Sequence, residues 1–150
     1  QRVSREKGGA IVLVSADVSG TGKDILVTRE DIREIQLAKA AIRAGVDALL
    51  TTTDTKPEEI VSFIIAGAFG TYLDLRSAIR IGMFPKLPLA RYRQIGNAAG
   101  AGAQLMLFHE PSRKAAKEIV EKMDYVELTT YPGFMDSYVN AISFEPVNKE

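Results

Sequence analysis

The feature that most constrains this sequence is an apolar run that ends in two glycines three residues apart, Ile64-Ile65-Ala66-Gly67-Ala68-Phe69-Gly70. A short helical pattern follows, to Asp74. The pattern predicts a buried strand, a tight turn and the start of a helix. Such a junction can bring backbone N–H groups and a helix dipole close to a ligand, often a nucleotide. On spacing alone, a turn that only lets the chain reverse closely is the commoner interpretation.

A second glycine turn follows the short strand predicted at Tyr92–Ile95. Asn97 suits the N-cap of a helix that contains Gly100 and Gly102. Each of these glycines costs about 1 kcal/mol of helix propensity relative to alanine. Either tight helix packing or a ligand against the backbone would offset that cost. Turns at the carboxyl ends of strands are where an open α/β sheet binds ligands, so the two turns could enclose a ribose and an adenine.

The amino-terminal part predicts two strands, Ile11–Val14 and Ile25–Thr28, joined by the flexible turn Ser19–Asp24. This turn superficially resembles a phosphate-binding loop, but Asp17 stands where that motif needs glycine and Asp24 where it needs Ser or Thr. We therefore interpret it as a turn between strands. We expect one domain over 1–150, with roughly 1–24 as a flexible or connecting segment and 25–144 as the core.

The strongest helical pattern begins after Thr28, which can form a capping box with Asp31. Its cations are most simply a solvated face, although one or two of them could line a ligand cleft. The apolar positions expected on one face are Ile32, Ile35, Ala38, Ile42, Val46 and Leu49, beside a strip of small residues at Ala38, Ala41 and Gly45.

The rest of the chain continues the alternation of strands and helices. Val61–Ala66 fits a central parallel strand covered on both faces. Asp74 can cap a helix that ends near Gly82, and Tyr125–Leu128 reads as a last strand. Phe134, Tyr138 and Ile142 predict a final helix. The alternation predicts an α/β fold with a mostly parallel sheet.

Composition excludes several classes of function. The 150 residues carry 19 basic and 19 acidic side chains, which argues against a nucleic-acid-binding surface. There is no cysteine, so this chain has no disulfide and no thiolate ligand for zinc or an iron–sulfur cluster. No apolar run approaches a membrane span. The single histidine, His109, reads as a surface residue beside a turn, and we nominate no catalytic residue and no metal ligand.

Four segments in this order resemble the C-terminal part of the reductive activators of corrinoid proteins. They are Asp31–Gly45, Ala66–Asp74, Ile95–Ala103 and Tyr125–Leu128. These activators are ferredoxin-like ATPases of the superfamily of acetate and sugar kinases, heat-shock chaperones and actin (ASKHA). The resemblance extends from about Ile25 to Phe144. It implies a ribonuclease-H-like (actin-like ATPase) half-domain, with a mostly parallel sheet flanked by helices.

The resemblance also implies an adenosine site. Gly67, Ala68, Phe69 and Gly70 match the superfamily's adenosine motif, and Gly96 and Asn97 would lie near it. Gln36, Lys39 and Arg43 are second-rank candidates, because the long helix is similar to the one that flanks the adenine pocket. Thr71 stands where many members have Asn.

The superfamily's phosphate motifs, the first lobe and the ferredoxin domain with its cluster-binding cysteines have no counterpart in this sequence. The resemblance therefore implies a truncated carboxyl-terminal segment of a cytoplasmic, ATP-dependent activator. ATP, Mg²⁺ and an iron–sulfur cluster would belong to the parent, whose partner would be the corrinoid protein of a methyltransferase system. We expect no membrane or nucleic-acid partner, and no appreciable ATP hydrolysis by this segment alone.

Two alternatives stay open. The first is a docking module for the corrinoid protein, using exposed residues such as Tyr131, Phe134 and Tyr138. The second is half of an acetate- or sugar-kinase-like phosphotransferase, which is disfavoured because no sugar- or acyl-binding acid can be nominated.

Overall fold

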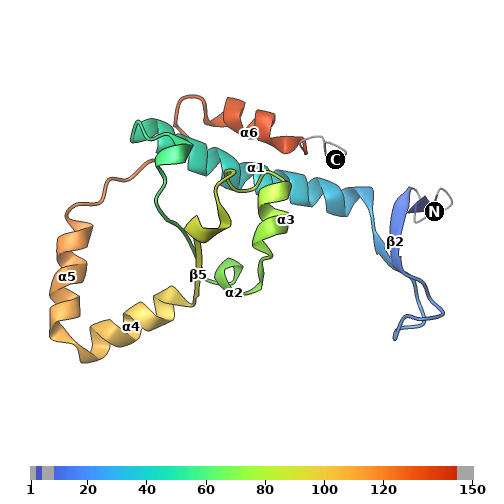
Figure 1. Ribbon diagram of the computed structural model, residues 1–150, viewed down its shortest axis with the longest axis horizontal. Helices are drawn as coiled ribbons and strands as arrows, with labels where there is room; N and C mark the ends of the chain where they lie inside the picture. Colours follow the sequence, from blue (N-terminus) through green and yellow to red (C-terminus); the bar gives the residue numbers. More distant parts are fainter. Residues whose placement is uncertain (1–2, 5–8, 145–150) are drawn as a thin grey trace.

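The computed structural model describes residues 3–4 and 9–144 of this chain (Figure 1). Its strands form two separate sheets, one antiparallel with the order β1-β2-β3 and one parallel with the order β4-β5. The elements in chain order are β1 (Val3–Ser4), β2 (Ala10–Val14), β3 (Ile25–Val27), α1 (Arg29–Thr52), η1 (Pro57–Glu59), β4 (Phe63–Ala66), α2 (Phe69–Tyr72), α3 (Leu75–Arg80), η2 (Leu89–Arg91), β5 (Tyr92–Gly96), α4 (Ala98–Phe108), α5 (Glu110–Val120) and α6 (Phe134–Ile142).

The antiparallel sheet lies beyond the start of α1 (Figure 1). It confirms the two predicted amino-terminal strands, because β2 pairs with β3 through partners such as Val12 and Leu26. The connection between them is a turn, as predicted. Within it, the backbone N–H of Ala16 donates to a carboxylate oxygen of Asp24 at 2.7 Å.

Helix α1 begins with the predicted capping box. The Thr28 N–H donates to the Asp31 carboxylate at 2.8 Å, and the Asp31 N–H donates to the Thr28 hydroxyl at 3.1 Å. These hydrogen bonds favour the ionised carboxylate and lower the pKa of Asp31. The two residues of this capping box, Thr28 and Asp31, are three positions apart, so the local sequence alone determines the cap.

The predicted apolar face of α1 was only partly right. Ile35 and Leu49 are 46% and 54% exposed, whereas the buried residues of this helix are Lys39, Ala40, Ala44 and Ala48. Helix α6 runs alongside α1 (Figure 1), and Ala44 and Ala48 lie together with Phe134 of α6. Small side chains one turn apart permit this close approach, which an apolar count does not register.

The hydrophobic core lies against one face of β4 and β5. Phe63, Phe84 and Tyr92 form an aromatic cluster in which the Phe63 ring centroid is 5.1 Å from that of Phe84 and 5.2 Å from that of Tyr92. Burial raises the pKa of the Tyr92 phenol, whose hydroxyl donates to the Pro85 carbonyl. The remaining buried members are Ile65, Ala78, Met83 and Leu87.

The prediction of a central strand covered on both faces was wrong for β4. Within the described residues β4 pairs only with β5, and Ile64, on the face opposite the core, is 55% exposed. An uninterrupted apolar run cannot distinguish a strand covered on both faces from one covered on a single face, so the sequence did not reveal this.

Helix α3 confirms the predicted cap. The Ser77 N–H donates to the Asp74 carboxylate at 2.8 Å, and hydrogen bonding from Ser77 lowers the pKa of Asp74. Gly82 follows the end of the helix, as predicted.

The predicted strand at Tyr125–Leu128 was wrong, because this segment has no regular secondary structure. The Glu127 carboxylate instead accepts hydrogen bonds from the Tyr125 hydroxyl at 2.7 Å and the Thr129 hydroxyl at 2.6 Å. The backbone N–H of Thr129 also donates to this carboxylate at 3.1 Å, so one main-chain donor is satisfied locally. Further along, α6 confirms the predicted final helix.

Helices α4 and α5 form an arm that extends away from the body made by α1, β4, β5 and α3 (Figure 1). His109 lies at the bend between them, where its Nδ1 shares a hydrogen bond of 2.7 Å with the Ser112 hydroxyl. The arm is apolar but exposed: Leu105 is 57% and Phe108 83% exposed. None of the described helices combines the length and apolarity needed to cross a membrane.

Candidate functional site

The two predicted glycine turns lie side by side. Strands β4 and β5 are parallel neighbours whose last paired residues are Ala66 and Gly96. The Gly67 N–H donates to the Gly96 carbonyl at 2.6 Å, which joins the two turns through their backbones. Gly67 has φ +73 and Gly96 φ +59, both in the left-handed region that glycine adopts without strain. The prediction that the turns are neighbours is confirmed.

Position 70 requires glycine because main-chain atoms of Ile65 and Gly96 approach it closely. An added Cβ there would lie 2.5 Å from the Ile65 carbonyl oxygen and 2.9 Å from the Gly96 nitrogen. Both are main-chain atoms, which cannot move aside as a flexible side chain could. Helix α2 can therefore cross the ends of β4 and β5 only because residue 70 has no side chain.

Two polar side chains hold the turns in place. The Gln94 amide donates to the carbonyls of Phe69 at 3.2 Å and Leu73 at 2.8 Å, which ties α2 to β5. The Thr71 hydroxyl donates to the Gly67 carbonyl at 3.4 Å. Sequence reasoning missed Gln94. The available signal was its position two residues after Tyr92, on the same face of the strand.

Helix α4 begins directly at the second turn. The Asn97 side-chain oxygen accepts a hydrogen bond from the Gly100 N–H at 2.9 Å, which confirms the predicted cap. An added Cβ at Gly100 would lie 2.5 Å from Asn97 Nδ2, so the capping side chain would have to shift to accommodate it. Gly102 differs, because a Cβ there would meet nothing within 4 Å.

The surface formed by these turns is open to solvent. Gly67, Ala68 and Asn97 are exposed, and Phe69 is 51% exposed. The first N–H groups of a helix have no partner within the helix, so the start of α4 leaves donors beside the Gly96 turn. The arrangement offers backbone donors, an exposed aromatic ring and little side-chain bulk, which suits a flat ligand lying against main chain.

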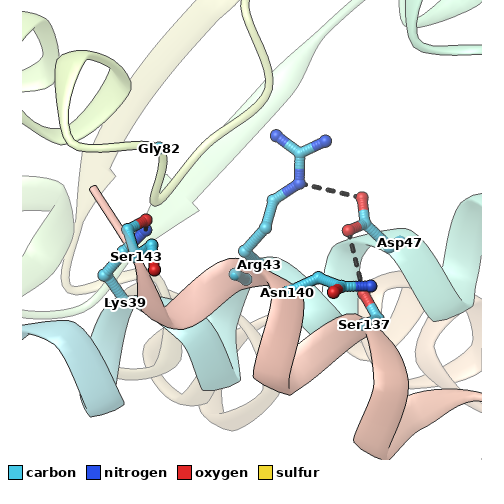
Figure 2. Close-up of a pocket in the computed structure, with 8 residues that line it drawn as sticks. Lys39, Arg43, Asp47, Gly82, Ser137, Asn140 and Ser143 are labelled. Carbon is cyan, nitrogen blue, oxygen red and sulfur yellow. Dashed lines mark hydrogen bonds and ion pairs between the residues drawn. The ribbon is translucent and has the colours of Figure 1, made fainter. Parts of the chain in front are cut away.

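Lys39 lines a pocket to which none of the glycine-turn residues contributes. Lys39 is 2% exposed, and its ammonium donates to the Ser143 carbonyl at 2.7 Å and lies 5.4 Å from the centroid of the Phe144 ring (Figure 2). It lines a pocket with Gly82, which follows α3, whereas the glycine turns precede α3. The structure thus brings Gly67–Gly70 together with Gly96 and Asn97, whereas the roles of Gln36 and Lys39 stay predictions.

The residues nominated for partner docking are not freely exposed. Tyr131, Phe134 and Tyr138 are half-buried, and the rings of Phe134 and Tyr138 are stacked with their centroids 6.4 Å apart. Phe134 lies against α1 near Ala44. Among the described residues, no group of three or more His, Cys, Asp or Glu side chains could hold a metal ion.

Parallel strands that end in glycine turns, each followed by a helix, define an α/β domain of the kind that binds nucleotides at strand ends. Comparison with known families makes the class specific. The family described as the C-terminal domain of RACo, the ASKHA domain, matches residues 1–150. This chain belongs to that family, which confirms the recognition made from the four motifs.

Individual relatives agree with the family. The corrinoid activation enzyme RamQ of Eubacterium limosum is 39% identical over 127 residues, which are 85% of this chain and 21% of RamQ. The [Co(II) methylated amine-specific corrinoid protein] reductase of Methanosarcina barkeri is 28% identical over 125 residues, 82% of this chain and 23% of that protein.

A solved structure confirms the fold. A reductive activator for corrinoid,iron-sulfur protein superposes with a TM-score of 0.83 and 39% identity, over 95% of this chain and 23% of that one. The fold is that of the ASKHA C-terminal domain, an α/β arrangement with a small parallel sheet flanked by helices. The chain spans less than a quarter of the length of these relatives.

Proposed function

We propose that this chain supplies one wall of the adenosine site in a reductive activator that uses ATP to reduce a corrinoid protein. The observation that carries the proposal is the backbone hydrogen bond between Gly67 and Gly96, which makes two glycine turns into one surface. The relatives support the rest, because their names describe corrinoid activation and reduction of a Co(II) corrinoid protein.

The geometry suits a nucleoside rather than a triphosphate. An added Cβ at Gly67 would meet nothing within 4 Å among the described residues, so the space in front of this turn is open to a ligand. The half-exposed ring of Phe69 offers a face for stacking, and the start of α4 offers N–H donors. Phosphates and Mg²⁺ would be held by other parts of a longer protein, so this chain alone is expected not to hydrolyse ATP appreciably.

The reaction of the whole activator would be a one-electron transfer. An iron–sulfur cluster held elsewhere in the activator would supply the electron that reduces Co(II) of the corrinoid to Co(I), and the cluster would be oxidised by one electron. This chain has no cysteine, so the cluster's ligands would lie outside it. ATP hydrolysis would drive the uphill transfer by closing the domain around the nucleotide and changing the contact with the partner. As part of the same proposal, we place the activator in the cytoplasm.

Matched glycine variants test the proposal. Gly67 and Gly22 both have positive φ, +73 and +64, and at both an added Cβ meets nothing within 4 Å. Gly67→Ala and Gly22→Ala therefore add the same backbone strain, one at the proposed site and one in the amino-terminal turn. In the full-length protein that carries this chain, we expect Gly67→Ala to weaken ATP binding about tenfold or more, because relief of about 1–3 kcal/mol of strain moves the turn out of its ligand-facing conformation. Gly22→Ala should leave it unchanged.

Two measurements give the readout. Isothermal titration with ATP reports affinity, and the absorbance of Co(I) reports ATP-dependent reduction of the corrinoid partner. Equal ATP affinity in the two variants would exclude the Gly67 turn as a wall of the site. Loss of corrinoid reduction in Gly67→Ala with ATP affinity intact would instead favour the docking role, for which the half-buried Tyr131, Phe134 and Tyr138 give little support.

A further inference from the structure

Helix α2 is too short to determine its own position. It has four residues, Phe69–Tyr72, and no side chain caps its first turn. A single turn of helix is unstable in water, because it fixes several backbone angles for few hydrogen bonds. Contacts with the rest of the fold must therefore determine where α2 lies, and with it the ring of Phe69, which is 51% exposed.

One side chain of β5 connects the two ends of α2. The Gln94 side-chain nitrogen donates to the carbonyl of Phe69, where α2 begins, at 3.2 Å, and to the carbonyl of Leu73, directly after α2, at 2.8 Å. A primary amide has two N–H donors, so these two hydrogen bonds use both. Because β5 ends at Gly96, this bridge holds α2 beside the second glycine turn.

Gln94 is not a core residue. It is exposed and does not belong to the hydrophobic core against β4 and β5. Its contacts are with the main chain of α2, and a hydrogen bond that water can replace contributes only modestly to folding. The placement of α2 is therefore the property that depends most on this side chain.

We propose that Gln94 is a positioning residue for the adenosine site, which holds α2 and the Phe69 ring in the arrangement that receives the base. The inference rests on the function proposed above, because it needs that surface to bind adenosine. Gln94 acts through α2 and need not touch the nucleotide. A protein whose binding-competent arrangement is only partly populated binds its ligand more weakly in proportion to that fraction. Loss of the bridge therefore weakens binding of the nucleoside while the fold stays intact.

Two variants remove the donors and keep the length of the side chain. Gln94→Glu introduces a carboxylate, which only accepts hydrogen bonds, and Gln94→Met has neither charge nor N–H. In the full-length protein we expect each to weaken ATP binding about tenfold, because both hydrogen bonds to α2 are lost together. Tripolyphosphate, which has no base, should bind to both variants as it does to the unchanged protein. Calorimetry measures both ligands.

Gln104→Glu is the matched control. Gln104 lies on α4 and is exposed, and its side chain has no hydrogen-bond partner among the described residues. The substitution changes the charge in the same way as Gln94→Glu and should leave ATP binding unchanged. Thermal unfolding without nucleotide completes the comparison. The Gln94 variants should unfold close to the temperature of Gln104→Glu, so that a loss of ATP affinity reports the position of α2.

ATP affinity that is unchanged in both Gln94 variants would overturn the proposal. Equal weakening of ATP and tripolyphosphate would also overturn it, as would a large fall in unfolding temperature, because either result means a general structural role. The unfolding temperature decides this point if tripolyphosphate binds too weakly to titrate. Gly67→Ala separates the two proposals. Weak ATP binding there with normal binding in the Gln94 variants contradicts only the role of Gln94, whereas normal binding in Gly67→Ala contradicts the adenosine wall itself.

Discussion

The body and the arm of this molecule handle their apolar residues in opposite ways. In the body, Phe84 and Tyr92 are 4% and 7% exposed and pack with Phe63 against one face of β4 and β5. In the arm, Leu107 and Phe108 of α4 and Val120 of α5 are 69%, 83% and 67% exposed. A helix that is apolar on all sides is typical of a buried position, yet α4 lies in the open. Among the described residues, the large apolar side chains are therefore buried mainly in the body and not in the arm.

The glycine turns lie at the junction of these two regions. Gly96 ends β5, which belongs to the body, and Asn97 caps α4, which begins the arm. Because the Gly67 turn is hydrogen-bonded to Gly96, any movement of α4 relative to β5 acts directly on the proposed adenosine wall. The well-packed core against β4 and β5 and the weakly packed helix α4 therefore meet at the place where a ligand would bind.

Truncation of an aromatic ring in each region should give the largest contrast. Phe84→Ala leaves a cavity in the body and should destabilise it by about 3–5 kcal/mol. Phe108→Ala removes an exposed ring and should change stability by less than about 0.5 kcal/mol. Urea unfolding followed through hydrogen exchange of the β4 and β5 amides measures both. Equal losses in the two variants would mean that the arm is as well packed as the body.

Two glycine-to-alanine changes sharpen the contrast near the junction. Gly70→Ala forces a Cβ to 2.5 Å from the Ile65 carbonyl oxygen, so we expect a destabilisation of about 1–3 kcal/mol. Gly102→Ala in α4 meets nothing within 4 Å and should stabilise the helix by up to about 1 kcal/mol. Thermal unfolding of the two variants gives opposite signs on this account. A stabilised Gly70→Ala protein would contradict the close approach of α2 to β5.

Acid should distinguish the two regions by a smaller effect. The body helices α1 and α3 are capped through Asp31 and Asp74, whose pKa values hydrogen bonding lowers from the ordinary 3.8, whereas α4 is capped by the neutral Asn97. A carboxyl group with a lowered pKa stabilises the fold fully above 3.8, and this contribution is lost as the pH falls through the lower folded-state value. Amide exchange in the first turns of α1 and α3, corrected for intrinsic rates, should therefore accelerate in acid.

Asp31→Asn and Asp74→Asn supply the control for the acid experiment. Each variant should lose the pH dependence at its own helix start and keep it at the other. The first turn of α4 should show none in any of these proteins. Acid-dependent opening that begins at α4 would show that other groups control the response.

Features set by neighbouring residues could be predicted from the sequence. The Thr28–Asp31 box, the Asp74 and Asn97 caps and the glycine turns all depend on interactions within a few residues or on backbone angles that glycine alone adopts freely. The family could also be recognised, because four motifs in order are specific.

Features set by distant partners could not be predicted. Lys39 is buried because it reaches the carbonyl of Ser143, a residue 104 positions away. The buried face of α1 follows from the path of α6, and the segment around Glu127 has no strand partner among the described residues. The face of Gln94 could be inferred from its position two residues after Tyr92, but its partners, the carbonyls of Phe69 and Leu73, lie 25 and 21 positions earlier and could not.

Photo-crosslinking with 8-azido-ATP tests the central claim most directly. The azide sits on the adenine, so in the full-length protein the label should attach to residues beside the base. We predict labelled peptides that contain the Gly67–Thr71 turn or the Gly96–Gly100 turn, with labelling suppressed by excess ATP. ATP-protected labelling confined to other parts of the protein, with both turns unmodified, would contradict the account.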